Sequence, residues 1–265
     1  MIEVRNHAPQ GSPPHQNGDV EYSNNQYGEV FADVYDDWYH DLDPVVEVVE
    51  FVRQLAEHTS VLELGVGTGR LAIPLAQSGL RVVGIDSSPA MLAALSAKPD
   101  GHLVEALLGH MVADMPDEQF GVVLLAYNTL FNLLTEPEQL ECLVQSAKRL
   151  LPGAHVIVDC FVPSDHLPQT VAPHVVRTMG ATSVFSEATI DEANQIMRGA
   201  FSESVGNTPA RTWVVRYATV EQIDAMADKA GLQVEQRWSS YAREPFSDNS
   251  VRHITVYGKA PDRPR

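Results

Sequence analysis

The stretch Val61-Leu-Glu-Leu-Gly-Val-Gly-Thr-Gly-Arg70 decides the fold of this 265-residue chain. Its apolar start predicts a short strand, and the glycines that follow at every second position predict a tight turn that opens a helix. Glycine lets the backbone approach a ligand closely, and the free amides at the start of a helix receive an anionic or polar group. The spacing differs from the dinucleotide fingerprint Gly-x-Gly-x-x-Gly, whose last position is Arg70 here. A strand–helix turn without a ligand would carry the same glycines, so this loop needs support from its neighbours.

Outward from this loop, the sequence alternates short apolar strands with helices. Strands are expected at 60–64, 81–85, 103–108, 120–125, 155–161, 232–241 and 251–259. Helices are expected at 24–40, from Pro44 to Leu55, and at 68–78, 89–97, 136–151 and 220–230. Parallel strands joined by helices of this length form right-handed crossovers. The pattern therefore predicts an α/β fold with a doubly wound, mostly parallel, Rossmann-like sheet of seven strands.

The segment 163–218 breaks this alternation, because its apolar residues follow β-rich patterns with few helix signals. We expect an antiparallel β lobe inserted after the fifth strand of the sheet. The core then comprises 21–162 and 219–260 and carries a helical lid at its N-terminal end. Residues 1–20 mix proline, glycine and polar residues and are expected to form a flexible tail.

Side chains at the strand ends support a ligand site at the glycine loop. Glu63 precedes the loop, where its carboxylate can accept a hydrogen bond or pair with an ammonium group. Asp86 ends the second strand, the place where doubly wound folds put an acid on ribose hydroxyls. Met91, at the start of the next helix, adds a polarizable side chain near an aromatic base. This combination favours a nucleoside-binding site over a purely structural turn.

These residues resemble those of the class I S-adenosylmethionine-dependent methyltransferases, over about residues 24–260. The resemblance implies that the glycine loop holds the methionine part of S-adenosylmethionine, Asp86 its ribose and Met91 its adenine. His110 stands where many relatives carry the acid of a Gly-Asp-Met motif. It either hydrogen-bonds the base through a ring nitrogen or is a surface histidine at a strand end. The expected cofactor-binding set is Glu63, Gly65, Gly67, Gly69, Asp86, Ser87, Met91, His110, Met111 and Ala126.

Three inner motifs, at 26–39, 127–134 and 159–163, narrow the resemblance. They are similar to actinobacterial small-molecule N-methyltransferases of antibiotic biosynthesis, of the lincosamide or amino-sugar type. The resemblance implies methyl transfer to an amine nitrogen of a small natural product. It also implies that the β lobe serves the substrate and a homo-oligomer.

Aromatic residues gather before the first strand. Tyr27, Phe31 and Tyr35 repeat every four residues and so share one face of the expected helix. Such a face commonly packs on a core, but a buried tyrosine hydroxyl requires a partner, and aromatic faces attract cations. We therefore expect Tyr27 and Tyr35 to line a pocket around the sulfonium cation. With Phe131, expected as a wall of the acceptor pocket, they form the candidate catalytic set.

Charge and composition exclude several classes of partner. The net charge is −17, and ten acids between Asn6 and Val52 stand without a lysine or arginine. Such a surface repels nucleic acid and anionic lipid; it is either a solvated face or one that attracts a cationic small molecule. No apolar run of about 18 residues predicts a membrane span. Two cysteines, Cys142 and Cys160, suit the reducing cytoplasm, and no metal site is expected.

Several reactions remain open from the sequence. An amine acceptor needs a neutral lone pair held close and aligned, whereas a hydroxyl acceptor needs a positioned base, commonly histidine. His40, His58 and His110 stand in no evident base position, which favours methylation of nitrogen over oxygen. His166, His174 and His253 lie elsewhere in the sequence and could reach the site through the fold. A nicotinamide-dependent oxidoreductase and a non-catalytic scaffold would also be compatible with a sheet of this kind. The glycine spacing and the two helices before the first strand argue against the oxidoreductase.

Overall fold

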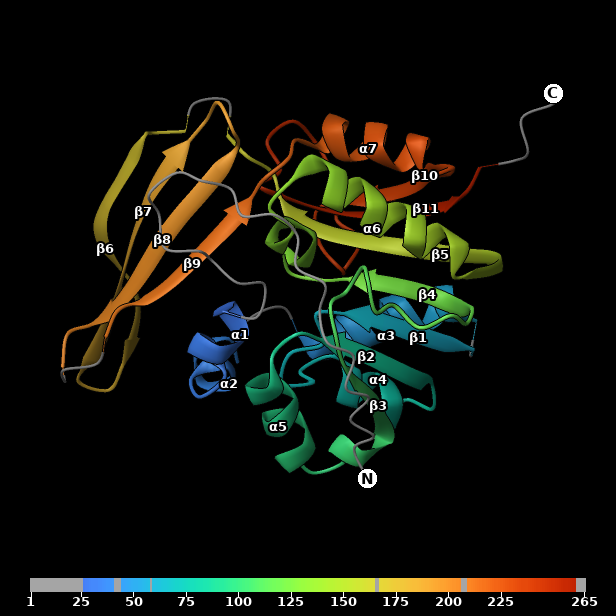
Figure 1. Ribbon diagram of the computed structural model, residues 1–265, viewed down its shortest axis with the longest axis horizontal. Coiled ribbons are helices and arrows are strands. Elements are labelled where there is room, and N and C mark those ends of the chain that lie inside the picture. Colours follow the sequence, from blue (N-terminus) through green and yellow to red (C-terminus); the bar gives the residue numbers. More distant parts are fainter. Residues whose placement is uncertain (1–25, 41–43, 58, 165–166, 206–208, 261–265) are drawn as a thin grey trace.

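Seven strands form one sheet, in the order β10-β11-β5-β4-β1-β2-β3 (Figure 1). The structure is a computed structural model and describes residues 26–40, 44–57, 59–164, 167–205 and 209–260. Strands β1 to β5 pair in parallel, whereas β11 pairs antiparallel with β5 and β10. The doubly wound α/β fold predicted from the sequence is confirmed. The strands are β1 (Ser60–Leu64), β2 (Arg81–Asp86), β3 (Val104–Leu108), β4 (Phe120–Leu125), β5 (Leu150–Phe161), β10 (Leu232–Trp238) and β11 (Arg252–Lys259).

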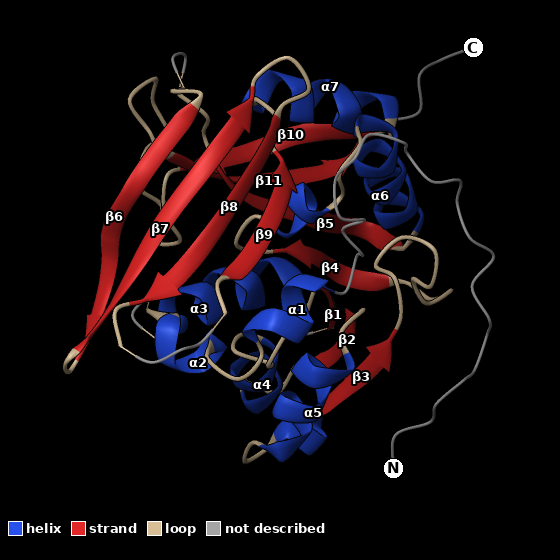
Figure 2. Ribbon diagram, turned by 60° about the vertical axis from the view of Figure 1, so that its left-hand side comes forward, coloured by secondary structure: helices blue, strands red, loops and turns tan. Residues whose placement is uncertain are grey.

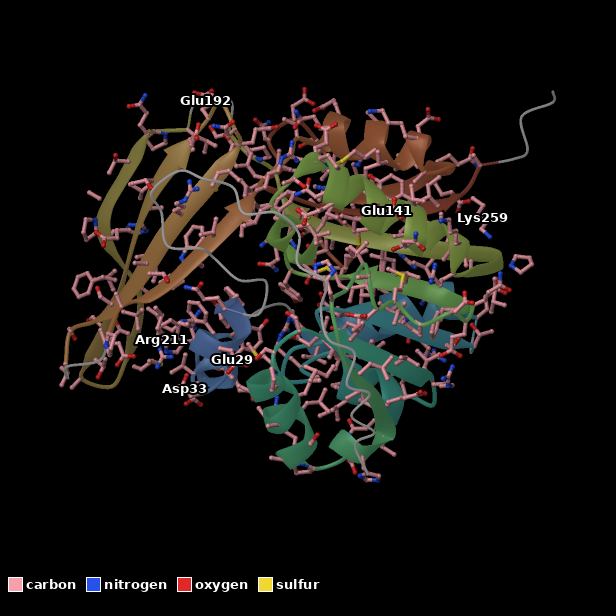
Figure 3. The ribbon with its side chains drawn as sticks, viewed as in Figure 1. Glu29, Asp33, Glu141, Glu192, Arg211 and Lys259 are labelled. Atoms are coloured by element: carbon pink, nitrogen blue, oxygen red, sulfur yellow. The ribbon has the colours of Figure 1, made fainter. Side chains whose placement is uncertain are left out.

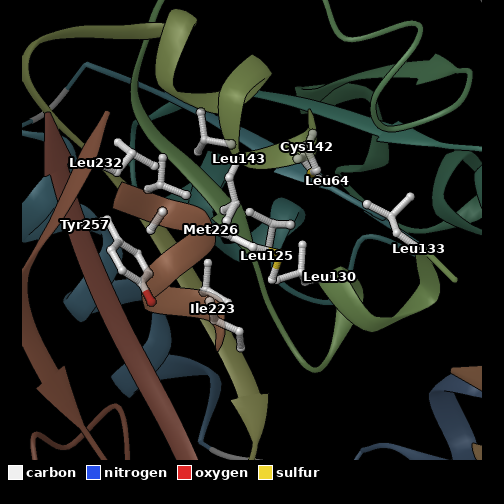
Figure 4. Packing of buried hydrophobic residues seen from close by; sticks show 14 of the residues in the cluster. Leu64, Leu125, Leu130, Leu133, Cys142, Leu143, Ile223, Met226, Leu232 and Tyr257 are labelled. Atoms are coloured by element: carbon white, nitrogen blue, oxygen red, sulfur yellow. The ribbon is translucent and has the colours of Figure 1, made fainter. Parts of the chain in front are cut away.

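Helices cover both faces of this sheet, so its central strands are buried on both sides. Every residue of β1 and β4 is buried. Because successive side chains of a strand point to opposite faces, Leu62 and Leu64 join one core while Val61 joins the other. Helices α6 and α7 cover the first core, shown in Figure 4, and α3, α4 and α5 contribute to the second. The helices are α3 (Val45–Ala56), α4 (Ala72–Gln77), α5 (Pro89–Ala97), α6 (Glu136–Lys148) and α7 (Val220–Lys229), with short 3-10 turns η1 (Gly101–Leu103) and η2 (Thr129–Asn132).

Four antiparallel strands form a separate sheet, which we call the lobe (Figure 2). The order is β6-β7-β8-β9, and the lobe follows β5 in the chain as predicted. In the β8–β9 register Gly199 lies opposite Trp213 and Met197 opposite Val215, so these side-chain positions share one face. The lobe strands are β6 (Thr170–Met179), β7 (Thr182–Asp191), β8 (Ile196–Glu203) and β9 (Arg211–Arg216).

The helix expected at 24–40 is interrupted: the structure has α1 (Gln26–Phe31) and α2 (Tyr35–Trp38). We call the segment 26–39, which contains both helices, the lid. A continuous helix would pair the Val30 carbonyl with the Val34 N–H. Instead, the Val34 N–H donates to Phe31 at 3.1 Å, and the Val30 carbonyl accepts a hydrogen bond from Arg211 of β9. The prediction of a single helix was wrong because Arg211, which binds the Val30 carbonyl, lies in a distant segment of the sequence.

Two further expected helices were too long. The helix expected at 68–78 begins only at Ala72, so the glycine loop extends further than predicted. The helix expected at 136–151 ends at Lys148, and Leu150 already belongs to β5, where it pairs with Phe120 of β4. At Leu150, pairing with a neighbouring strand therefore outweighs a local pattern that favours a helix.

His253 on β11 makes the stability of the fold depend on pH. It is fully buried, and burial lowers the pKa of its imidazole to about 4, with Arg237 adding to the effect. The unfolded chain takes up the proton near pH 6.5, so stability is fully present above that pH and is lost as the pH falls toward 4. We expect the free energy of unfolding to fall by about 2 kcal/mol between pH 7.5 and 5 from this residue.

Urea denaturation at several pH values tests this expectation. The variant His253→Asn should lose that part of the pH dependence, while His102→Asn, at an exposed position, should keep it. Equal pH slopes for wild type and His253→Asn would show that the buried imidazole is not responsible.

Within the described ranges, no helix is long and apolar enough to cross a membrane. The expected tail at 1–20 lies outside the described residues.

Candidate active site

A cavity of about 300 Å³ lies at the carboxyl ends of the central strands, between the core, the lid and the lobe. In the sheet order β1 is flanked by β4 and β2, so the strand order reverses there, which is where open α/β sheets bind ligands. Of the predicted site residues, it brings together Tyr27, Tyr35, Glu63, Gly65, Gly67, Asp86, Ser87, Met91, His110, Met111 and Ala126.

The glycine loop is held in shape by Asp86. The Gly67 N–H donates to one carboxylate oxygen of Asp86 at 2.8 Å, and the Ser88 N–H donates to the other at 2.9 Å. Gly65, Gly67 and Gly69 all have positive φ angles, which favour glycine. Burial raises the pKa of Asp86, and the backbone amides oppose that shift. The loop and the acid thus form one unit that lines the cavity.

Glu63 brings an unpartnered carboxylate oxygen to the cavity. Its side chain is 5% exposed, and its Oε2 has no hydrogen-bond partner among the described residues. Burial raises the pKa of Glu63 to about 8; Asp86 adds to this shift, and Arg70 opposes it. A buried acid without a partner is costly, so this oxygen is suited to a cationic or hydrogen-donating ligand group.

Arg70 is a lining residue whose role the sequence analysis did not assign. Its guanidinium lies 4.0 Å from the centroid of the Tyr127 ring, and its buried Nε has no hydrogen-bond partner within the described part of the chain. Glu63 and Arg70, two lining residues of the same cavity, therefore each have a buried unpartnered atom: an acceptor oxygen on Glu63 and an N–H donor on Arg70. The residue appeared in the sequence only as a departure from a dinucleotide motif.

The lid brings three tyrosines to the cavity: Tyr27, Tyr35 and Tyr39. Their rings pack on neighbours, Tyr27 on Phe31 at 4.5 Å and Tyr35 against Tyr39 at 4.8 Å between centroids. Burial raises the pKa of Tyr35 to about 12 and also raises the pKa of Tyr39, so both phenols stay neutral near pH 7. Tyr27 and Tyr35 line the cavity as expected, and their rings also pack on neighbouring aromatic residues.

Three lid carboxylates connect the lid to its surroundings. Glu29 accepts a hydrogen bond from Ser88 at 2.8 Å, and Asp36 accepts one from Thr68 at 2.7 Å. Asp33 pairs with Arg211 of the lobe at 2.7 Å, which Figure 3 shows beside α1. Part of the acidic stretch therefore fastens the lid and is not merely a solvated face.

His110 lines the cavity, and hydrogen bonds from the backbone orient its ring. Its Nδ1 accepts hydrogen bonds from the Val112 and Ala113 N–H groups, both at 3.3 Å. A nitrogen that accepts carries no proton, so in this arrangement the neutral ring has its N–H at Nε2. His110 is thus equipped to donate a hydrogen bond.

Two predicted residues do not line the cavity. A Cβ at Gly69 would lie 2.8 Å from the Leu95 side chain, so this glycine allows the loop to pack on α5. Phe131 is fully buried and packs against Phe161, whose ring lies 5.1 Å away and does line the cavity. The structure therefore places Phe131 behind the wall that it was expected to form.

The turn after β4 carries lining residues that the sequence analysis left without a role. Tyr127 and Asn128 both have positive φ angles, an uncommon conformation outside glycine. Asp159 of β5 holds this turn: its carboxylate accepts from the Tyr127 N–H at 3.0 Å and its carbonyl from the Asn128 N–H at 2.8 Å. Arg252 pairs with the same buried carboxylate at 2.6 Å. No local sequence signal shows these contacts, because they join separate strands.

A metal site is not found among the residues that the structure places: no group of three or more histidine, cysteine or acidic side chains could hold an ion there.

Comparison with known proteins connects this site to a family. Residues 61–153 match the model of a methyltransferase domain. The chain is 31% identical to the cypemycin N-terminal methyltransferase of a Streptomyces species, over 87% of this chain and 96% of that protein. It is 34% identical to the CcbJ methyltransferase from Streptomyces caelestis, with a TM-score of 0.85, over 91% of this chain and all of that one. The amino pentose methyltransferase CalS10 from Micromonospora echinaspora, solved with S-adenosylmethionine bound, shares the fold at 17% identity and a TM-score of 0.64, over 91% of this chain and 99% of that one.

Proposed function

Because this chain belongs to the S-adenosylmethionine-dependent methyltransferases, we propose that it transfers a methyl group to an amine nitrogen of a small-molecule natural product. The relatives named for an N-terminal amine and an amino sugar support an amine acceptor. The TM-score of 0.85 with the 34% identical methyltransferase structure, over 91% of this chain, supports a related reaction.

The described residues fit the cofactor. S-adenosylmethionine, when bound, supplies an electrophilic methyl group on a sulfonium sulfur. Its amino-acid end carries an ammonium and a carboxylate, and the unpartnered Glu63 Oε2 and Arg70 Nε match these two charges. Asp86 retains oxygens that can accept from ribose hydroxyls. Gly67 leaves the space that a side chain would fill, because an added Cβ there would meet only the Met91 sulfur, at 3.9 Å. His110 and Met91 are then available to the base.

In this proposal the chain acts chiefly by positioning. Glu63, Arg70 and Asp86 fix the two ends of the cofactor, and the lid closes over it. Tyr27 and Tyr35 surround the sulfonium with neutral aromatic faces, which attract cations by roughly 0.5–2 kcal/mol each. Alignment of two reacting atoms about 3–3.5 Å apart contributes roughly 7–11 kcal/mol to lowering the barrier.

The residues that line the cavity favour a nitrogen acceptor over an oxygen acceptor. His110 is the one histidine among its described lining residues, and its ring is committed to the turn at Val112 and Ala113. A hydroxyl acceptor would need a base that these residues do not offer. Mass spectrometry with fragmentation of methylated products tests this: methyl groups on nitrogen are expected, and methyl groups exclusively on oxygen would contradict the proposal.

The lid tyrosines provide a prediction for turnover. Replacing Tyr35 with Phe removes a hydroxyl that interacts with Arg70 but keeps the ring. We expect kcat to fall about tenfold, because Arg70 loses a hydrogen bond that orients its guanidinium, and one hydrogen bond to a charged group contributes about 1.5–3 kcal/mol. The same loss should lower the melting temperature by several degrees without unfolding the protein at the assay temperature. Steady-state kinetics and thermal denaturation measure the two effects. The matched control Tyr217→Phe, in the core far from the lining set, should keep full turnover; unchanged kcat in Tyr35→Phe would assign Tyr35 to packing alone.

We extend the proposal to the assembly and the compartment. Strand β6 lies at an edge of the lobe and exposes Val175 and Val176, by 52% and 45%. An unpaired edge with apolar side chains is suited to pairing with a second copy of the chain. A monomer by light scattering at all concentrations would contradict the homo-oligomer.

Cys142 and Cys160 are free and buried, which supports a reducing cytoplasm as the compartment.

A further inference from the structure

The cavity has two chemically different walls. The wall formed by the core carries its charged groups, Glu63, Arg70 and Asp86. The opposite wall comes from one face of the lobe, where the β8–β9 register aligns alternate residues. We call this second set the acceptor wall: Met197, Phe201, Trp213 and Val215.

The acceptor wall contains no charged side chain. Among the described lining residues, Glu63 and Asp86 are the carboxylates and Arg70 is the guanidinium, all on the core side. Arg211 continues the same face of β9, but it pairs with Asp33 of the lid and is not a lining residue. Arg177 lies outside the lining set, 5.7 Å from the Tyr39 ring. A charged group of an acceptor would therefore lose water at this wall without gaining a partner.

Building on the proposed amine methylation, we infer that the acceptor is an amine on an uncharged, largely apolar framework and that it enters the cavity as the free base. An ammonium group has no lone pair and so cannot attack the methyl carbon. The lid tyrosines are the lining groups nearest the acceptor wall that carry a proton, and burial raises the pKa of Tyr35 and Tyr39, so neither is a base near pH 7. The amine must therefore lose its proton to water before it binds.

The charge balance of the transfer agrees with this assignment. The amine lone pair forms the new N–C bond, and the electron pair of the broken C–S bond stays on sulfur. The positive charge thus moves from sulfur to nitrogen within the same tyrosine-lined space, so the net charge of the cavity does not change. The methylated ammonium loses a proton to water after release, wherever a proton remains on its nitrogen.

Acceptor binding to the complex with S-adenosylhomocysteine tests the free-base form without turnover. The probes are phenethylamine and L-phenylalaninamide, whose ammonium pKa values are about 10 and about 8. By calorimetry at pH 9 in buffers of different ionisation enthalpy, phenethylamine should release nearly one proton and L-phenylalaninamide almost none. Both probes meet the same Glu63 and His110, so the difference belongs to the acceptor. Binding of phenethylamine without proton release, or no binding of either probe, would overturn the inference.

Charged analogues test the framework. L-phenylalanine differs from its amide by one carboxylate, and O-phospho-L-tyrosinamide differs from L-tyrosinamide by one phosphate. We expect kcat/KM at least about 100-fold lower for each charged member, because an unpaired buried charge costs several kcal/mol. Equal or better methylation of the charged members would overturn the inference but keep the proposed function. If the protein binds S-adenosylhomocysteine but methylates none of these amines, the result would contradict the proposed function itself.

A variant of the lobe tests the wall. Trp213 packs over Gly199, where an added Cβ would lie 2.2 Å from the indole ring. Gly199→Ala should displace the indole and weaken binding of L-phenylalaninamide about tenfold, while the Kd of S-adenosylhomocysteine stays within about twofold. The control Thr212→Ala, at an exposed position on the same strand, should change neither. Unchanged acceptor binding in Gly199→Ala would remove Trp213 from the acceptor site.

Discussion

The variant Asp86→Ala is expected to weaken binding of S-adenosylhomocysteine at least about 100-fold. Asp86 accepts from the Gly67 and Ser88 N–H groups, and in the proposed complex it also accepts from the ribose. Hydrogen bonds to a charged group contribute about 1.5–3 kcal/mol each, so two of them account for this loss. The variant also releases the glycine loop, which adds to the effect. Isothermal titration calorimetry measures the change.

Two further variants separate binding from folding. Asp117→Ala removes a fully exposed carboxylate of the same kind and should bind like the wild type. Asp86→Asn keeps the shape of the side chain but cannot accept on both sides, and it should still bind at least about tenfold more weakly. Wild-type affinity in a folded Asp86→Ala protein would show that the ribose is held elsewhere.

Binding of S-adenosylhomocysteine is expected to release a proton from Glu63. With a pKa of about 8 in the free protein, Glu63 is mostly protonated at pH 7. An ammonium group beside Oε2 favours the carboxylate and lowers this pKa, so affinity should rise with pH up to about 8 and then level off. Calorimetry in buffers of different ionisation enthalpy counts the protons. We expect close to one at pH 7.

The variant Glu63→Gln should lose this proton release and bind about 10- to 100-fold more weakly, because its partner is charged. Two controls sharpen the result. Glu105→Gln, an exposed acid on β3, should behave like the wild type. The ligand 5′-methylthioadenosine lacks the amino-acid end and should bind wild type and Glu63→Gln alike. If Glu63→Gln still released the proton, another group would hold the ammonium.

Local patterns were sufficient for the sheet but not for the contacts between segments. The strands at β1, β2 and β4 were predicted because buried apolar runs and glycine punctuation are local signals. The break in the lid was missed because the guanidinium that takes the Val30 carbonyl comes from Arg211. The early start of β5 was missed because the conformation of Leu150 is set by its pairing with Phe120 of β4 and not by the local helical pattern.

The site shows the same division. Glu63, Asp86 and the loop glycines could be named in advance, because strand ends and glycine spacing fix where such side chains emerge. Arg70 could have been named from its place beside the loop, but the need for a second charge became visible only beside the unpartnered Glu63. Asp159 acts on the turn at Tyr127 from another strand, which no single segment of sequence reveals.

A crystal structure of the chain with S-adenosylhomocysteine tests the central claim most directly. The account predicts the amino-acid end between Glu63 and Arg70, the ribose on Asp86, and the sulfur facing Tyr27 and Tyr35 toward the acceptor wall. Density for the ligand outside this cavity, or an adenine lying against the lobe with the sulfur turned away from the tyrosines, would contradict it.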